Sequence, residues 1–143
     1  MTRPFIRFRV ATRTTGIRRQ VFVHVYDNRE QMHEAHEIAR GKPYDPTDDV
    51  GGGLAVQQGF RWPRPEVTPI IVMRLWDGQL TTRTIAHEAT HAAAYLYFMD
   101  AVPGWNSRAR AALLGDHEPL AYLVGDITAE VVKQLYAHGC LES

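Results

Sequence analysis

The pattern of apolar and polar residues begins with two segments that are typical of β-strands. Apolar and polar residues alternate from Phe5 to Arg13, and valine and phenylalanine recur from Arg19 to Tyr26. A period of two is typical of a strand that buries one face, and the stretch Thr14-Thr15-Gly16 between the segments suits a turn. These residues therefore predict a β-hairpin.

A short polar helix is predicted next, from Arg29 to Arg40, with Asn28 as its cap and Gly41 and Pro43 ending it. It contains the run His33-Glu34-Ala35-His36-Glu37, whose histidines are three residues apart. On a polar helix such histidines are expected to lie on the solvated surface, so we do not expect a second metal site here.

Glycine and proline dominate residues 41–69, where one short strand is predicted from Leu54 to Phe60. A long irregular stretch in a small domain often carries function, and this one could form a wall of a binding cleft. The clearest strand pattern runs from Thr68 to Trp76, after which Asp77-Gly78 turns the chain into a helix.

Two helices are predicted in the remaining third of the chain. The threonines of the sequence Leu80-Thr81-Thr82-Arg83 can cap the first helix, which extends to about Met99. The second begins at about Arg108 or His117 and ends at Ala137. Its apolar residues recur at helical spacing, namely Leu120, Val124, Ile127, Val131 and Leu135.

Composition is that of one globular domain. With 143 residues, 45% of them hydrophobic and 22% charged, residues 1–143 are expected to form a single α+β domain with its own core. Cys140 is the only cysteine, which excludes a disulfide framework and a cysteine zinc site. We find no leader-like segment and no membrane span, so a cytoplasmic protein is expected.

Charge is balanced over the whole chain but not along it. Lysine plus arginine and aspartate plus glutamate number 16 each, so no overall field favours nucleic acid or an anionic membrane. The first nineteen residues nevertheless hold six arginines and no acid. A solvated strand face explains this cluster more readily than a nucleic-acid-binding arm does, although the arm remains an alternative.

The strongest chemical signal is the sequence His87-Glu88-Ala89-Thr90-His91, an H-E-x-x-H motif within the first of the two C-terminal helices. Histidines four residues apart lie on one face of a helix, so both imidazoles can reach one metal ion. Glu88 is then placed to take a proton from a metal-bound water. Zinc peptidases use this combination to make hydroxide near neutral pH.

Apolar residues around the motif predict that its helix is largely buried, namely Ile85, Ala86, Ala89, Ala92, Ala93, Leu96 and Met99. Buried histidines need partners, and a metal ion is the simplest partner for both. The alternative is a pair of satisfied core histidines beside a chance glutamate.

Catalytic zinc usually has three protein ligands and one open position. The downstream candidates for the third ligand are Asp116, His117 and Glu118, all near the start of the last helix. The pattern H-E-x-x-H-x-x-G-x-x-H fails, because Ala94 and Tyr97 occupy its glycine and third-histidine positions. The remaining scheme, a glutamate on a following helix, suits Glu118.

Two runs of sequence together resemble a known family. The first is Thr68–Ala94 (TPIIVMRLWDGQLTTRTIAHEATHAAA), and the second is Asp116–Ile127 (DHEPLAYLVGDI), which has the form E-x-x-A-Y. They are similar to small H-E-x-x-H zinc metallopeptidases encoded by bacteriophages and prophages, relatives of the glutamate-type zincins. The resemblance covers roughly the C-terminal half of the chain.

This resemblance implies a zincin-like fold, with a small, mostly antiparallel sheet packed on the motif helix and a following C-terminal helix. It implies Zn²⁺ as cofactor, His87, His91 and Glu118 as its ligands, and Glu88 as the catalytic base. The sequence departs from the family at Tyr122, because many glutamate-type zincins have an aspartate four residues after the ligand glutamate. Tyr122 would then accept a histidine N–H or polarise a substrate carbonyl.

Alternatives remain for several of these roles. Glu118 can instead be a first-turn acid favoured by the helix dipole. A separate alternative is that His117 is the ligand, and Asp116 suits the helix cap. His117 or Tyr95 could replace Tyr122 in steadying an oxyanion, although Tyr95 is more typical of a core residue.

The expected function is zinc-dependent hydrolysis of a peptide or protein substrate. If the strand Thr68–Trp76 forms the edge of the sheet, an extended peptide can pair with it. Two rival functions are a zincin-fold binding or regulatory module with little turnover and a nucleic-acid-associated protein that uses the N-terminal arginines.

Overall fold

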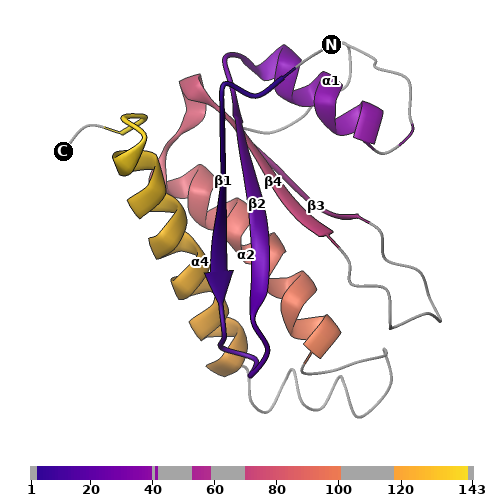
Figure 1. The fold of residues 1–143 in the computed structure, drawn as a ribbon, viewed down its shortest axis with the longest axis vertical. Coiled ribbons are helices and arrows are strands. Elements are labelled where there is room, and N and C mark those ends of the chain that lie inside the picture. The colour runs from indigo at the N-terminus through magenta and orange to yellow at the C-terminus, as the bar shows by residue number, and fades with distance from the viewer. Residues whose placement is uncertain (1–2, 40, 42–52, 59–69, 101–117, 142–143) are drawn as a thin grey trace.

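The computed structural model describes residues 3–39, 41, 53–58, 70–100 and 118–141 (Figure 1). In chain order, its elements are β1 (Ile6–Thr12), β2 (Arg19–Tyr26), α1 (Arg29–Ala39), β3 (Gly53–Gln58), β4 (Ile70–Trp76), the 3₁₀ helix η1 (Asp77–Gln79), α2 (Thr82–Asp100) and α4 (Glu118–Ala137). The predicted hairpin, helices and strands in these ranges are confirmed to within a few residues at their ends. Asp116, His117 and the proposed start at Arg108 lie outside the described residues.

The four strands form one mixed sheet in the order β1-β2-β4-β3. β1 and β2 pair antiparallel, β2 and β4 pair parallel, and β3 and β4 pair antiparallel. The parallel pair requires a crossover between β2 and β4, and the chain enters it through α1. The α+β class is confirmed, and the sheet is mixed, with a parallel central pair and an antiparallel pair on each side.

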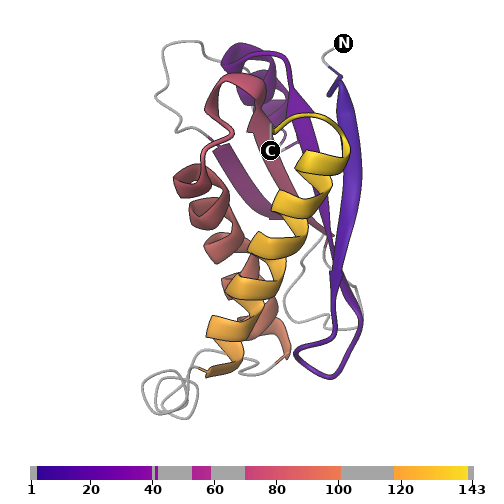
Figure 2. The same ribbon diagram turned by 90° about the vertical axis from the view of Figure 1, so that its left-hand side faces the viewer.

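Two helices cover one face of the sheet and one helix covers part of the other. Figures 1 and 2 show α2 and α4 side by side on the first face, and α1 on the opposite face near one end of the strands. The sheet therefore packs on the motif helix and the C-terminal helix, as predicted.

The hydrophobic core lies between the sheet and the α2–α4 layer. Alternate residues of the two central strands point into it and are buried, namely Val21, Val23, Val25, Ile71, Met73 and Leu75. α4 contributes a stripe at four-residue spacing, made of Leu123, Ile127, Val131 and Leu135. Each such side chain contributes about 1.5–3 kcal/mol when it is fully buried.

Small residues let α2 approach its neighbours closely. Ala89, Ala92 and Ala93 are fully buried in the core, whereas the longer side chains of Ile85 and Leu96 fill the space on either side. Because alanine adds little volume, the backbone of α2 can lie close to α4 and to the sheet. This packing holds the motif in place.

The predicted capping residues are found at the N-termini of α1 and α2. The Oδ1 atom of Asn28 accepts a hydrogen bond from the backbone N–H of Gln31 at 2.9 Å, at the start of α1. The Oγ1 atom of Thr81 accepts one from the backbone N–H of Thr84 at 3.1 Å, at the start of α2. Each bond satisfies an N–H that the first turn of a helix leaves without a partner.

The position of β4 differs from the edge position considered for it. β4 pairs on both sides, with β2 and with β3, so the outermost strand next to it is β3. The continuous apolar run Ile70–Met73 agrees with this central position, because a strand that is covered on both faces need not alternate.

The prediction for α1 is wrong in one respect. His33 and His36 are buried, at 3% and 6% exposure, rather than solvated. The reason is tertiary: α1 packs its histidine-bearing side, together with Met32, on the second face of the sheet. The polar composition of α1 did not indicate that this helix packs on the second face of the sheet.

No helix in the described ranges is long and apolar enough to cross a membrane.

Candidate metal centre

The motif histidines occupy the exposed side of α2. Both His87 and His91 are exposed, and the His87 side chain retains 66% of its accessible surface. The predicted burial of these two histidines is therefore wrong, and they are not a core pair. The apolar residues around them face the core, whereas His87 and His91 belong to the part of the helix that α4 and the sheet leave open.

The two imidazoles are nevertheless close together. Their Nε2 atoms are 3.2 Å apart, and the rings are nearly perpendicular, with an interplanar angle of 76°. A zinc ion with Zn–N bonds of 2.0–2.1 Å at the tetrahedral angle requires two nitrogens about 3.3–3.4 Å apart. The spacing of the histidine pair fits two ligands of one tetrahedral ion. Without an ion, the same spacing fits a hydrogen bond from one ring to the other.

Glu88 is the buried member of the motif. It is 4% exposed, and its Oε1 atom lies 3.8 Å from Nε2 of His87. Burial removes water from the carboxylate and raises the pKa of Glu88 to about 7. A carboxylate of this pKa beside the histidine pair has the basicity that a general base needs near neutral pH.

The structure does not bring Glu118 to this group. α2 and α4 run in opposite directions (Figures 1 and 2), so the start of α4 lies toward the end of α2. His91 is nine residues from that end, which corresponds to about 14 Å along the helix axis. Within the ranges that the structure describes, no group of three histidine, cysteine, aspartate or glutamate side chains is arranged to hold a metal ion. Glu118 instead occupies the exposed first turn of α4, as in the helix-dipole alternative.

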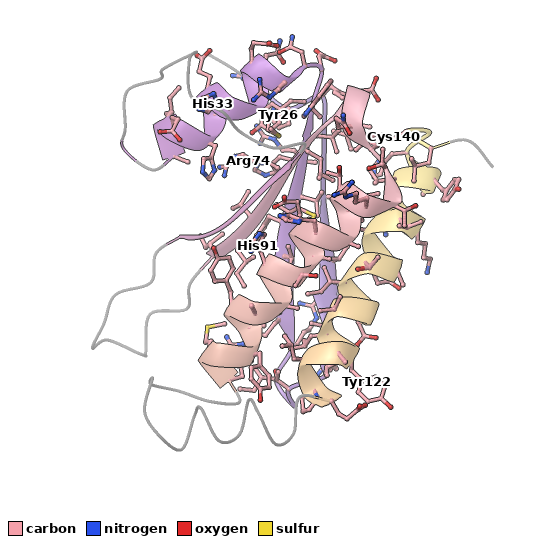
Figure 3. The ribbon with its side chains drawn as sticks, turned by 180° about the vertical axis from the view of Figure 1, so that it is seen from behind. Tyr26, His33, Arg74, His91, Tyr122 and Cys140 are labelled. Atoms are coloured by element: carbon pink, nitrogen blue, oxygen red, sulfur yellow. The ribbon has the colours of Figure 1, made fainter. Side chains whose placement is uncertain are left out.

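Tyr122 is also remote from the histidines. Its side chain is 64% exposed, and Figure 3 shows it on the outer side of α4, whereas His91 projects from the opposite flank of α2. Tyr95 is closer in register, because it follows His91 by four residues on the same helix. It is partly buried and packs against the core.

Sequence reasoning missed one buried charge on the other side of the sheet. Arg74 lies in the centre of β4 and is only 5% exposed. The signal was present in the sequence, because an arginine interrupts the apolar run Ile-Ile-Val-Met-Arg-Leu-Trp. A charge inside a strand that is buried on both faces requires a partner.

No protein-family model, curated protein or solved structure matches this chain. The interpretation of the site therefore depends on the motif and on the positions of its own side chains.

Proposed function

We propose that the protein is a zinc-dependent peptidase of the zincin type, with His87 and His91 as zinc ligands and Glu88 as general base. The observation that carries the proposal is the combination of a zinc-compatible histidine spacing with an adjacent buried carboxylate. Burial of the acid and exposure of the ligands are both useful, because solvent and substrate must reach the metal while the base keeps a raised pKa.

Zinc in this position would lower the pKa of a bound water to about 7 and polarise a substrate carbonyl. Glu88 takes a proton from the attacking water, which then forms the new bond to the carbonyl carbon. The same carboxyl group passes that proton to the departing amine as the peptide bond breaks. Burial of Glu88 favours both steps, because a pKa of about 7 lets the carboxyl group accept a proton from the water and release it to the amine.

The sheet supports an extended peptide as the substrate. β3, rather than β4, is the outer strand of the described sheet, and α2 packs against it. An extended chain can pair with the free backbone groups of an outer strand and lie along the helix that bears His87 and His91. The proposed pairing strand is therefore β3, whereas the sequence suggested the strand that became β4.

The remaining roles carry less structural support. Glu118 can act as third ligand only in an arrangement that brings the start of α4 to the histidine pair. Tyr122 would require the same rearrangement to assist catalysis. Tyr95 needs none, since it shares the flank of α2 that bears His91, and it is the better candidate for a donor to the developing oxyanion.

A binding or regulatory module is the second candidate. Among the described residues, no third histidine, cysteine, aspartate or glutamate completes a metal-binding group with His87 and His91, whereas catalytic zinc usually has three protein ligands. Such a module would bind zinc through the two histidines with little or no turnover.

The Glu88→Gln variant distinguishes these functions when zinc content and peptide hydrolysis are measured together. For a peptidase, the variant keeps its zinc and loses about 10²–10⁴-fold in rate on a broad panel of fluorogenic peptides. The matched control is Glu30→Gln, which neutralises an exposed acid in the first turn of α1 and is expected to change neither quantity. Equal activity of wild type and Glu88→Gln excludes the proposed base, and a zinc-loaded wild type without activity identifies the binding module.

A further inference from the structure

Three basic side chains form a row across the sheet on the face opposite the motif helix. The strand register pairs Arg7 of β1 with His24 of β2, and His24 with Arg74 of β4. Neighbouring strands are about 4.8 Å apart, so adjacent members of this row are within reach of one ligand. Exposure falls along the row, from exposed Arg7 through half-buried His24 to buried Arg74.

Two of the three guanidinium nitrogens of Arg74 have no acceptor among the described residues. Its Nε and Nη1 atoms are buried, and neither makes a hydrogen bond in the part of the chain that the structure describes. A guanidinium group is always charged and can only donate, so the group missing here is an acceptor, and a negatively charged one is favoured. Leaving such a charge buried without compensation costs several kcal/mol, by the order of magnitude known for buried ions.

The surroundings of the row are positive. Burial, together with the positive charges of Arg74 and Arg7, lowers the pKa of His24 to about 4. The titratable groups that α1 buries on this side of the sheet are His33, His36 and Glu37. Glu37 is the one acid among them. His24 is therefore neutral at pH 7, and the two arginines give the row a charge of two.

We propose that the row formed by Arg7, His24 and Arg74 binds a phosphate group, either free or as a monoester. Phosphate carries a charge of about −1.5 to −2 at neutral pH, which matches two arginines better than a single carboxylate does. Its oxygens are acceptors for the unmet donors of Arg74 and for His24 in its protonated or neutral donor form. Arg7 marks the exposed end of the row, from which a ligand can enter.

This site is separate from the candidate metal centre. The row lies on the face of the sheet that α1 partly covers, whereas α2 with His87 and His91 lies on the other (Figures 1 and 3). Phosphate binding at this row is therefore independent of zinc binding and of peptidase activity.

Calorimetric titration of the full chain with inorganic phosphate tests the proposal, with sodium acetate and sodium chloride at equal ionic strength as comparisons. We expect saturable binding of phosphate, with acetate at least tenfold weaker and chloride showing none. Ribose 5-phosphate is titrated in parallel: tighter binding than phosphate indicates an esterified ligand, and equal binding indicates the free ion. Binding of none of these anions, or of acetate as tightly as phosphate, overturns the proposal.

Variants locate the binding. Arg74→Met should abolish phosphate binding and Arg7→Gln should weaken it at least tenfold. The matched control is Arg9→Gln, which removes the same charge from the same exposed face of β1 one row away and should bind as wild type does. Unchanged binding by Arg74→Met, or equal weakening by Arg9→Gln, contradicts the assignment.

A second measurement keeps the test decisive if Arg74→Met does not fold. In wild type, the NMR titration of the His24 ring is recorded with and without phosphate. A bound dianion should raise the pKa of His24 from its low value, because it offsets the charges of Arg7 and Arg74. An unchanged titration in saturating phosphate overturns the site.

Discussion

Arg19 and Asp100 form a bidentate ion pair that joins the start of β2 to the last residue of α2. The Nη2 atom of Arg19 lies 2.6 Å from Oδ1 of Asp100, and its Nε atom donates to Oδ2 at 3.0 Å. Thr15 donates a third hydrogen bond to Oδ2 at 2.7 Å. A carboxylate at the C-terminal end of a helix is unfavourable by itself, so these donors are what make Asp100 acceptable there.

Asp100→Asn should destabilise the protein by about 3 kcal/mol, because it leaves Arg19 without its counter-charge in a mostly buried pair. Burial, the largest influence, raises the pKa of Asp100, but the hydrogen bonds from Arg19 and Thr15 and the charge of Arg19 together hold it below its ordinary value. The contribution is therefore present above the unfolded pKa of about 3.9 and is lost as the pH falls through the lower folded pKa.

Urea unfolding of wild type and Asp100→Asn at pH 7, 4 and 3 measures this difference in unfolding free energy. The gap should be full at pH 7 and should shrink below pH 4. Asp27→Asn, which removes an exposed carboxylate, serves as the control and should change stability by less than about 0.5 kcal/mol. A gap that is independent of pH would contradict the role of the pair.

Gly78 and Gly125 are predicted to respond oppositely to alanine. A Cβ atom at Gly78 would overlap the indole ring of Trp76, so the ring has to move. Gly125 is exposed in α4, and a Cβ atom there meets nothing within 4 Å. Thermal unfolding should show Gly78→Ala destabilised by about 1–3 kcal/mol, with altered tryptophan fluorescence. Gly125→Ala should be stabilised by about 0.5–1 kcal/mol. Equal effects at both positions would exclude the close approach of Trp76.

The elements were predictable because their signals are local. Alternation defines β1 and β2, and the side chains of Asn28 and Thr81 fix the starts of α1 and α2 within one turn of sequence. The relative positions of the elements were harder to predict from the sequence. Whether β4 is central or at an edge depends on where β3 pairs, and the burial of His33 depends on which face of the sheet α1 covers.

The candidate site was predicted in part, because sequence spacing fixes the proximity of residues within one helix but not between two helices. His87, Glu88 and His91 share one helix, so their proximity follows from helical geometry. Glu118 belongs to another helix, and its distance from the histidines depends on the direction and offset of α4 against α2. The exposure of the histidines was misjudged because the apolar residues between them, such as Ala89, face the opposite side of the helix.

Glu118→Gln tests the third-ligand assignment. In the observed arrangement Glu118 is a first-turn acid of α4, so the variant should retain zinc and lose only about 0.3–1 kcal/mol of stability from the helix dipole. Zinc content and urea unfolding of the purified variant measure both. Loss of zinc with His87 and His91 intact would instead assign Glu118 as a ligand and would require α4 to approach the pair.

The histidine pair should stabilise the fold when zinc binds to it. Because zinc binds the folded state preferentially, added Zn²⁺ should raise the midpoint of thermal unfolding in wild type, in proportion to its excess over the dissociation constant. His91→Ala should abolish this shift. His138→Ala, which removes an exposed histidine outside the motif, should preserve it. An equal shift in all three proteins would indicate nonspecific binding.

The most direct test is elemental analysis of the protein purified without added metal, carried out on wild type and His87→Ala. If these two imidazoles hold the ion, wild type contains about one zinc per chain and His87→Ala contains almost none. A wild type free of zinc that also fails to take it up, or a His87→Ala variant with an undiminished zinc content, would contradict the account.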